Sequence, residues 1–72
     1  MPGWQTVDGK RLRELRLEKM FSQSELAKLA DTTQVTVSVL ERGKRRAQPR
    51  TVRRLSDALG VEPRELLQDS EG

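Results

Sequence analysis

Two helix-start signals near the middle of the chain leave few ways for it to fold. The first is the stretch Ser22–Glu25, a capping box in which the Ser22 hydroxyl can accept a hydrogen bond from the Glu25 amide while the Glu25 side chain reaches back. The second is Thr33, an N-cap residue that follows the turn residue Asp31. The spacing predicts two short consecutive helices joined by a turn.

The segment after Thr33, Gln34–Leu40, is ambiguous between helix and strand. Its β-branched residues alternate as they would in a strand. However, the signals on both sides belong to helices, a lone strand would lack a partner, and Gly43 can supply a helix stop. We therefore predict a helix that buries Val37 and Leu40.

Three further helices are expected around this pair. Asp8 is a suitable N-cap for a first helix that ends near Lys19. Pro49 suits the first position of a fourth helix that stops at Gly60, and Pro63 suits the start of a short fifth helix. The pattern as a whole predicts an all-α fold.

The length of 72 residues allows one domain at most, with a small apolar core. We expect the domain to occupy residues 9–67, after a flexible N-terminal segment over 1–8 and before a frayed acidic tail over 68–72. No apolar run approaches the length of a bilayer-spanning helix, and the first residues lack the features of a secretory signal. The sequence therefore predicts a cytoplasmic protein without a membrane partner.

The residue types exclude several kinds of chemistry. The chain has no cysteine and no histidine, so the usual zinc and iron ligand sets are absent, and we expect no metal and no cofactor. No potential nucleophile has a suitable base nearby, and no glycine-rich phosphate loop exists. We therefore expect no catalytic residues and no enzymatic activity.

The positive charge is concentrated in one part of the chain. The net charge is only +3, but half of the basic residues lie between Arg42 and Arg54, a stretch without a single acidic residue. Such a stretch is typical of a surface that meets phosphates. The alternative is an ordinary solvated loop.

These signals together resemble the Cro/repressor (XRE-type) helix-turn-helix family, to which the lambdoid phage repressors belong. The resemblance extends over residues 10–67 and centres on the unit Gln23–Arg42, with a small residue at Ala27 and apolar residues at Val37 and Leu40. It implies a compact five-helix, lambda-repressor-like domain whose helix-turn-helix is formed by helices 2 and 3. It also implies binding to double-stranded DNA.

Two positions depart from the family pattern. Most relatives have glycine where this chain has Asp31 in the turn, and glycine often ends the first helix where this chain has Met20. Asp tolerates the left-handed backbone conformation better than most residues, but at some cost. We expect these departures to affect the local turn geometry and not the fold.

The resemblance places the third helix in the major groove, where its first turn would meet the base edges. The candidates for base readout are Thr33, Gln34, Val35 and Val39. The Gln34 amide can donate to N7 and accept from N6 of adenine, and the valines can contact thymine methyl groups, so we expect a preference for A·T pairs. The alternatives are a solvent-facing Gln34 and a valine that packs on a neighbouring helix or at a protein interface.

A second set of residues is expected to hold phosphates without reading sequence. Gln23 begins the second helix, where backbone N–H groups favour anions, and the resemblance implies that it also orients Gln34. The basic residues after the third helix are expected to lie along the DNA backbone. The expected phosphate contacts are Gln23, Ser38, Arg42, Lys44, Arg45, Arg46 and Arg11.

The resemblance also implies one structural ion pair. In several phage repressors, the positions equivalent to Arg16 and Glu41 tie the first helix to the end of the third. If this pair is partly buried, removing one partner should cost more than breaking a surface salt bridge, because the other charge stays uncompensated.

The function predicted from these features is sequence-specific transcriptional regulation, most simply repression. The resemblance implies a palindromic operator, a homodimer at least on DNA, and a place at the nucleoid in the cytoplasm. The alternative is a protein-interaction module, such as an antitoxin or an adaptor that contacts RNA polymerase. Trp4 favours that alternative, because an isolated tryptophan in a flexible segment can anchor a protein partner.

Overall fold

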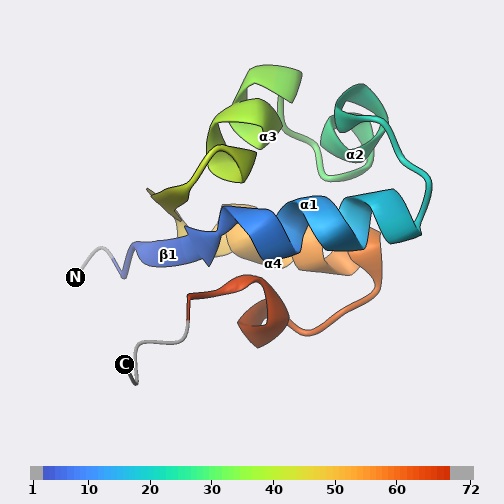
Figure 1. Cartoon of the computed structure of the whole chain (residues 1–72). Coiled ribbons are helices and arrows are strands. Elements are labelled where there is room, and N and C mark those ends of the chain that lie inside the picture. The colour runs from blue at the N-terminus through green and yellow to red at the C-terminus, as the bar shows by residue number, and fades with distance from the viewer. Residues whose placement is uncertain (1–2, 69–72) are drawn as a thin grey trace.

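A computed structural model describes residues 3–68 of the chain, so residues 1–2 and 69–72, with all but the first residue of the expected acidic tail, lie outside the described part. Figure 1 shows short helices packed in layers, with a small strand pair at one end of them. In chain order, the elements are strand β1 (Gln5–Asp8), helices α1 (Gly9–Glu18), α2 (Gln23–Leu29) and α3 (Gln34–Glu41), strand β2 (Lys44–Ala47), helix α4 (Pro49–Leu59) and the 3₁₀ helix η1 (Pro63–Leu66).

The three predicted side-chain caps are confirmed. Asp8 accepts from the Arg11 backbone N–H at 3.2 Å and begins α1. Ser22 and Glu25 form the complete capping box of α2. Thr33 accepts from the Thr36 backbone N–H at 3.1 Å and begins α3. These caps fix the starts of the helices because each satisfies a backbone donor that the helix leaves free.

The ambiguous segment after Thr33 is helical, as predicted. As a helix it buries Val37 completely and Leu40 almost completely, since Leu40 is only 4% exposed. The strand-like alternation of its β-branched residues is overridden because the cap and the core both require the helical spacing.

The expectation of an all-α fold was wrong in one respect, since a two-stranded sheet is present. β1 and β2 are antiparallel, with a register that runs from Gln5 opposite Ala47 to Asp8 opposite Lys44. The strand β1 lies in the segment expected to be flexible, and β2 lies in the segment expected to be a basic loop. Each strand is held against the core by one buried side chain: Val7 of β1 is fully buried, and Ala47 of β2 is 6% exposed.

The expected fifth α-helix is a 3₁₀ helix instead. It begins at Pro63, as predicted, but its single turn ends at Leu66. The chain then becomes extended: Leu67 forms a bridge with Val7, and the Gln68 backbone N–H donates to the Thr6 carbonyl at 2.9 Å. The described residues therefore form four α-helices, one 3₁₀ turn and a sheet that ties both ends of the domain together.

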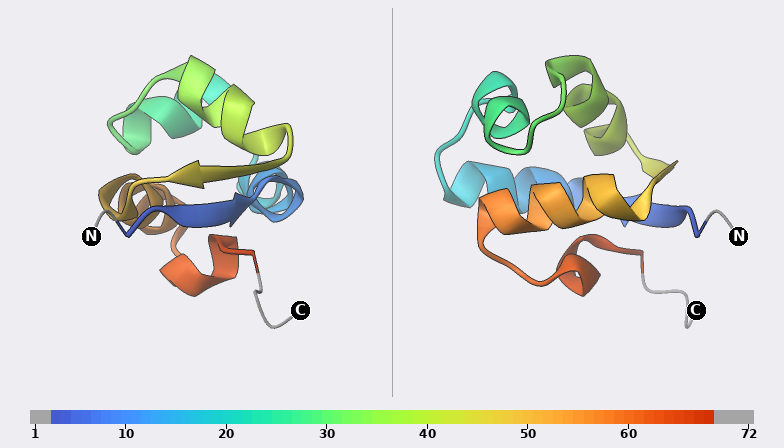
Figure 2. Two further views of the ribbon diagram at one scale, coloured as in Figure 1. Left: turned by 90° about the vertical axis from the view of Figure 1, so that its left-hand side faces the viewer. Right: turned by 180° about the vertical axis from the view of Figure 1, so that it is seen from behind.

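The helices lie in layers about α1 and α4. In all three views, α2 and α3 lie on one side of these two helices, and η1 lies on the other side (Figures 1 and 2). The core between them is formed mainly by leucines and valines, and every element contributes to it, β2 through Ala47. Among residues 3–68, no helix is both long and apolar enough to cross a membrane.

The two residues that stand where relatives have glycine adopt the backbone conformation that favours glycine. Met20 and Asp31 both have left-handed backbone conformations, with φ of 61° and 57°. Gly43 follows the end of α3, as predicted, but it lacks the positive φ that is common at such a stop. The helix ends there because the chain turns directly into β2.

Candidate nucleic-acid interface

Helix α3 presents an exposed polar and apolar face on the side away from the core. Gln34 is exposed, and Val35 is 71% exposed. Ser38 and Val39, one turn later, are partly exposed. Val35 is therefore not packed on a neighbouring helix of the domain, whereas Val39 is partly covered.

A chain of hydrogen bonds runs from the protein interior to this face. Arg16 donates to Glu41 through Nε, 2.6 Å from Oε2, and through Nη2, 3.0 Å from Oε1. The Gln23 amide nitrogen also donates to Oε1 of Glu41, at 3.1 Å. The Gln34 amide nitrogen in turn donates to the Gln23 carbonyl oxygen, at 3.2 Å. Each side chain therefore orients the next one, from α1 to the start of α3.

The buried end of this series of hydrogen bonds is the ion pair between Arg16 and Glu41 that the family resemblance implies. The Arg16 and Glu41 side chains are only 9% and 5% exposed. Arg16 also donates to the Phe21 carbonyl at 2.8 Å, which ties the end of α1 to the start of the next segment. Hydrogen bonding to Glu41 raises the pKa of the Arg16 guanidinium, against the opposing effect of burial. Arg16 therefore keeps its charge although it is buried.

The Thr33 hydroxyl is already hydrogen-bonded within the protein, which the sequence alone does not show. Its hydroxyl oxygen already accepts from the Thr36 backbone N–H, and its hydroxyl donates to the Thr36 hydroxyl oxygen at 3.0 Å. Thr33 is exposed, so its methyl group and the second acceptor position of its hydroxyl oxygen are left for a base contact.

The basic residues expected to contact phosphates divide into two groups. Arg42 at the end of α3 and Arg45 and Arg46 on β2 are exposed; the side chain of Lys44 is outside the described part of the structure. Arg11 lies elsewhere. It pairs with Glu14 at 3.8 Å and with Glu65 of η1 at 3.7 Å, and η1 lies on the opposite side of α1 from α3.

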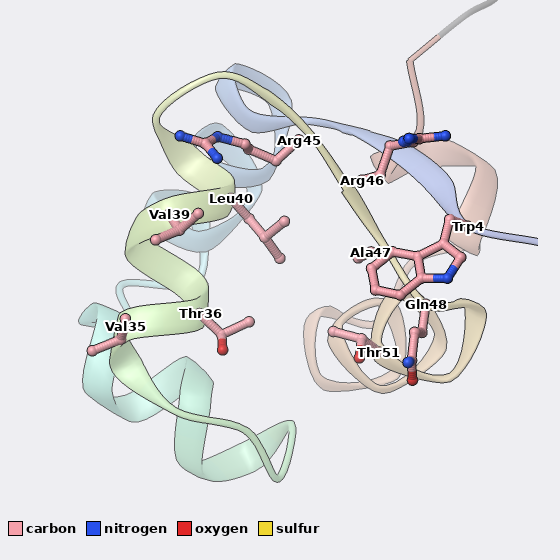
Figure 3. Close-up of a pocket in the computed structure, with 10 residues that line it drawn as sticks. All are labelled: Trp4, Val35, Thr36, Val39, Leu40, Arg45, Arg46, Ala47, Gln48 and Thr51. Atoms are coloured by element: carbon pink, nitrogen blue, oxygen red, sulfur yellow. The ribbon is translucent and has the colours of Figure 1, made fainter. Parts of the chain in front are cut away.

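A groove of about 440 Å³ borders the exposed face of α3. Figure 3 shows Val39 and Leu40 from α3 on one side and Trp4, Gln48 and Thr51 on the other. The groove could not be predicted from the sequence, because Trp4 reaches it only through the pairing of β1 with β2. No local pattern in the sequence signals that pairing.

Gly9 is a second residue without a sequence signal. It is the first residue of α1 and is buried against the end of α3. A Cβ atom at this position would collide with the Leu40 carbonyl oxygen and would lie 2.6 Å from the carbonyl oxygen of Gly43. The close approach of α1 to α3 therefore requires glycine here.

Comparisons with known proteins give matches over most of the chain. The model of a family described as helix-turn-helix matches residues 12–66. The control protein C.BamHI of Bacillus amyloliquefaciens is 38% identical over 60 residues, which cover 82% of this chain and 74% of that protein.

Two solved structures are similar over most of their length. The restriction-modification controller protein C.AhdI from Aeromonas hydrophila is 44% identical, with a TM-score of 0.76, and the match covers 82% of this chain and 89% of that one. The P22 c2 repressor, solved in complex with a synthetic operator, is 30% identical, with a TM-score of 0.78 and coverage of 83% and 91%.

Proposed function

This chain belongs to the helix-turn-helix family, and from that membership and the geometry of α3 we propose that it is a sequence-specific regulator of transcription that binds double-stranded DNA. In this proposal, α3 enters the major groove and the start of α2 lies against the DNA backbone. The regulator acts on the nucleoid in the cytoplasm, and repression by occupation of a promoter is its simplest action.

The observation that carries the proposal is the position of the Gln34 amide. One N–H of this amide is used by Gln23. Its second N–H and its carbonyl oxygen remain available, and this pair matches N7 and N6 of adenine. Because Gln23 is itself held by Glu41, the amide is oriented before DNA arrives. This preorganisation supports direct readout of one A·T pair, next to thymine contacts by Val35 and Val39.

Phosphate contacts would position α3 in the groove. We assign them to the exposed residues around its two ends: Gln23, Ser38, Arg42, Arg45 and Arg46, together with Lys44 by its place in β2. Arg11 is left out, because it pairs with Glu65 on the opposite side of α1.

Two copies of the domain would bind a palindromic operator. The eight residues of α3 span about 12 Å, which corresponds to about four base pairs and is too short for a unique site. The domain measures 30 × 22 × 21 Å. Two domains side by side can therefore place their α3 helices about 34 Å apart, in successive major grooves.

The regulated genes are suggested by one relative. The protein from Aeromonas hydrophila, 44% identical to this chain, is a controller of a restriction-modification system. We propose that this chain regulates genes of the same kind, which predicts that its operator lies upstream of such genes.

The salt dependence of duplex binding tests the proposed function. We expect the wild-type protein to bind a fluorescently labelled mixed-sequence duplex, with an affinity that falls steeply as salt rises. Arg45→Ala should reduce the slope of log affinity against log salt concentration by about 0.9 per protomer. The measurement is fluorescence anisotropy at several salt concentrations.

Arg11→Ala is the matched control, since it removes the same charge on the opposite side of α1 from α3. Its slope should equal that of the wild type. If the wild type fails to bind the duplex, the proposed function is wrong. If Arg11→Ala lowers the slope as much as Arg45→Ala does, the assigned phosphate surface is wrong.

A further inference from the structure

We propose that Trp4 is a DNA contact, and that the groove between Trp4 and α3 receives the sugar-phosphate backbone of one DNA strand. This inference rests on the proposed function and extends it to the N-terminal strand. The occupant is a DNA strand whose sugars lie against the apolar wall and whose phosphates lie toward Arg45.

The position of Trp4 is the first reason. Gln5 pairs with Ala47 at the end of the two-stranded sheet, so Trp4, one residue earlier, is carried to the rim of the groove. Trp4 is 49% exposed and does not belong to the core cluster. A large aromatic side chain that is held in place and left half-exposed is suited to a binding contact.

The composition of the groove is the second reason. Its floor contains the buried side chains Leu40 and Ala47, and its α3 wall contains Val39. Arg45 lies on the α3 side of the groove, beside Val39 in Figure 3, and is exposed. An apolar floor beside a cationic rim matches a deoxyribose-phosphate chain, which alternates apolar sugar faces with anionic groups.

The continuity of the groove with the reading face is the third reason. Val35 and Val39 line the groove and are also the residues expected to contact thymine methyl groups. A ligand that covers the outer face of α3 therefore reaches the groove. The stretch between Arg42 and Arg54 has no acidic residue, so nothing on β2 repels an anionic strand there.

Trp4 is the single tryptophan of the chain, so its emission reports on this contact alone. We expect the emission spectrum of the wild-type protein to change when a mixed-sequence duplex is added at low salt. Trp4→Ala should bind the same duplex about fivefold more weakly. Because no charge is removed, the slope of log affinity against log salt should stay at the wild-type value.

Leu17→Ala is the matched control. Leu17 is 51% exposed, nearly the same as Trp4, but it lies on α1 and does not line the groove. This variant should bind DNA with wild-type affinity and give the full change in emission. Thermal unfolding followed by circular dichroism should show that Trp4→Ala remains folded, because Trp4 is outside the core cluster.

The outcomes separate the two claims. If the wild type binds the duplex, but its emission is unchanged and Trp4→Ala binds equally well, the inference is wrong, while the proposed function stands. If Trp4→Ala alters the salt slope as a lost phosphate contact does, an apolar contact is excluded. If no duplex binds at all, both claims fail together.

Discussion

Arg16→Ala should lower the free energy of unfolding by about 3 to 5 kcal/mol. The substitution leaves the Glu41 carboxylate, whose side chain is 5% exposed, without its cationic partner. It also removes the donor to the Phe21 carbonyl and thus loosens the end of α1. For a domain of this size, such a loss lowers the melting temperature by about 15 to 30 °C.

Calorimetry or denaturant titration would measure this effect. The matched control is Arg54→Ala, because Arg54 pairs with Asp31 at 3.6 Å with both side chains well exposed, and its loss should cost less than about 1 kcal/mol. The double substitution Arg16→Met with Glu41→Leu should recover most of the stability, since no charge is then left buried alone. Equal melting temperatures for the two single arginine variants would contradict the structural role of the buried pair.

Gly9→Ala should be the second strongly destabilising substitution, at about 3 kcal/mol. Alanine is normally the better helix former, so helix propensity alone predicts a gain in stability at this position. The structure predicts the opposite sign, because the added Cβ meets the backbone of α3, which cannot move aside as a side chain can.

Gly43→Ala provides the control for this prediction. A Cβ atom added at Gly43 would meet no other atom within 4 Å, and the φ of Gly43 is not positive, so alanine is tolerated there and should change stability by less than about 0.5 kcal/mol. Both variants can be measured by denaturant titration. An unchanged or raised stability of Gly9→Ala would show that α1 and α3 do not approach as closely as the structure indicates.

The helix-turn-helix unit could be predicted from the sequence because its signals are local. The capping box at Ser22 and the N-cap at Thr33 act within three residues of themselves, and the structure confirms both. Asp31 and Met20 could likewise be identified as departures at turn positions, because relatives have glycine there, and both residues have a positive φ.

The sheet could not be predicted in this way because its pairing is not local. Gln5 and Ala47 are far apart in the chain, and four-residue strands carry too little alternation to stand out. The same reason explains why the close backbone approach at Gly9 and the position of Trp4 beside α3 were not predicted. Each depends on what a distant segment brings next to it, and neither residue type reveals such a neighbour.

The candidate site was predicted in part. The family resemblance implied the contacts between Gln23 and Gln34 and between Arg16 and Glu41. In the structure, hydrogen bonds connect all four residues in one series. The sequence alone could not show that Arg11 turns toward Glu65, since a basic residue on α1 can face either side until the tertiary packing is known.

The central claim is that Gln34 reads a base from the start of α3. The most direct measurement is selection of bound sequences from a random duplex pool, carried out in parallel with the wild type and with Gln34→Ala. We expect the wild type to enrich a symmetric motif with an adenine at one defined position of each half-site. Gln34→Ala should lose the preference at that position alone and bind the wild-type motif about 10- to 100-fold more weakly. An identical motif from both proteins would contradict the account.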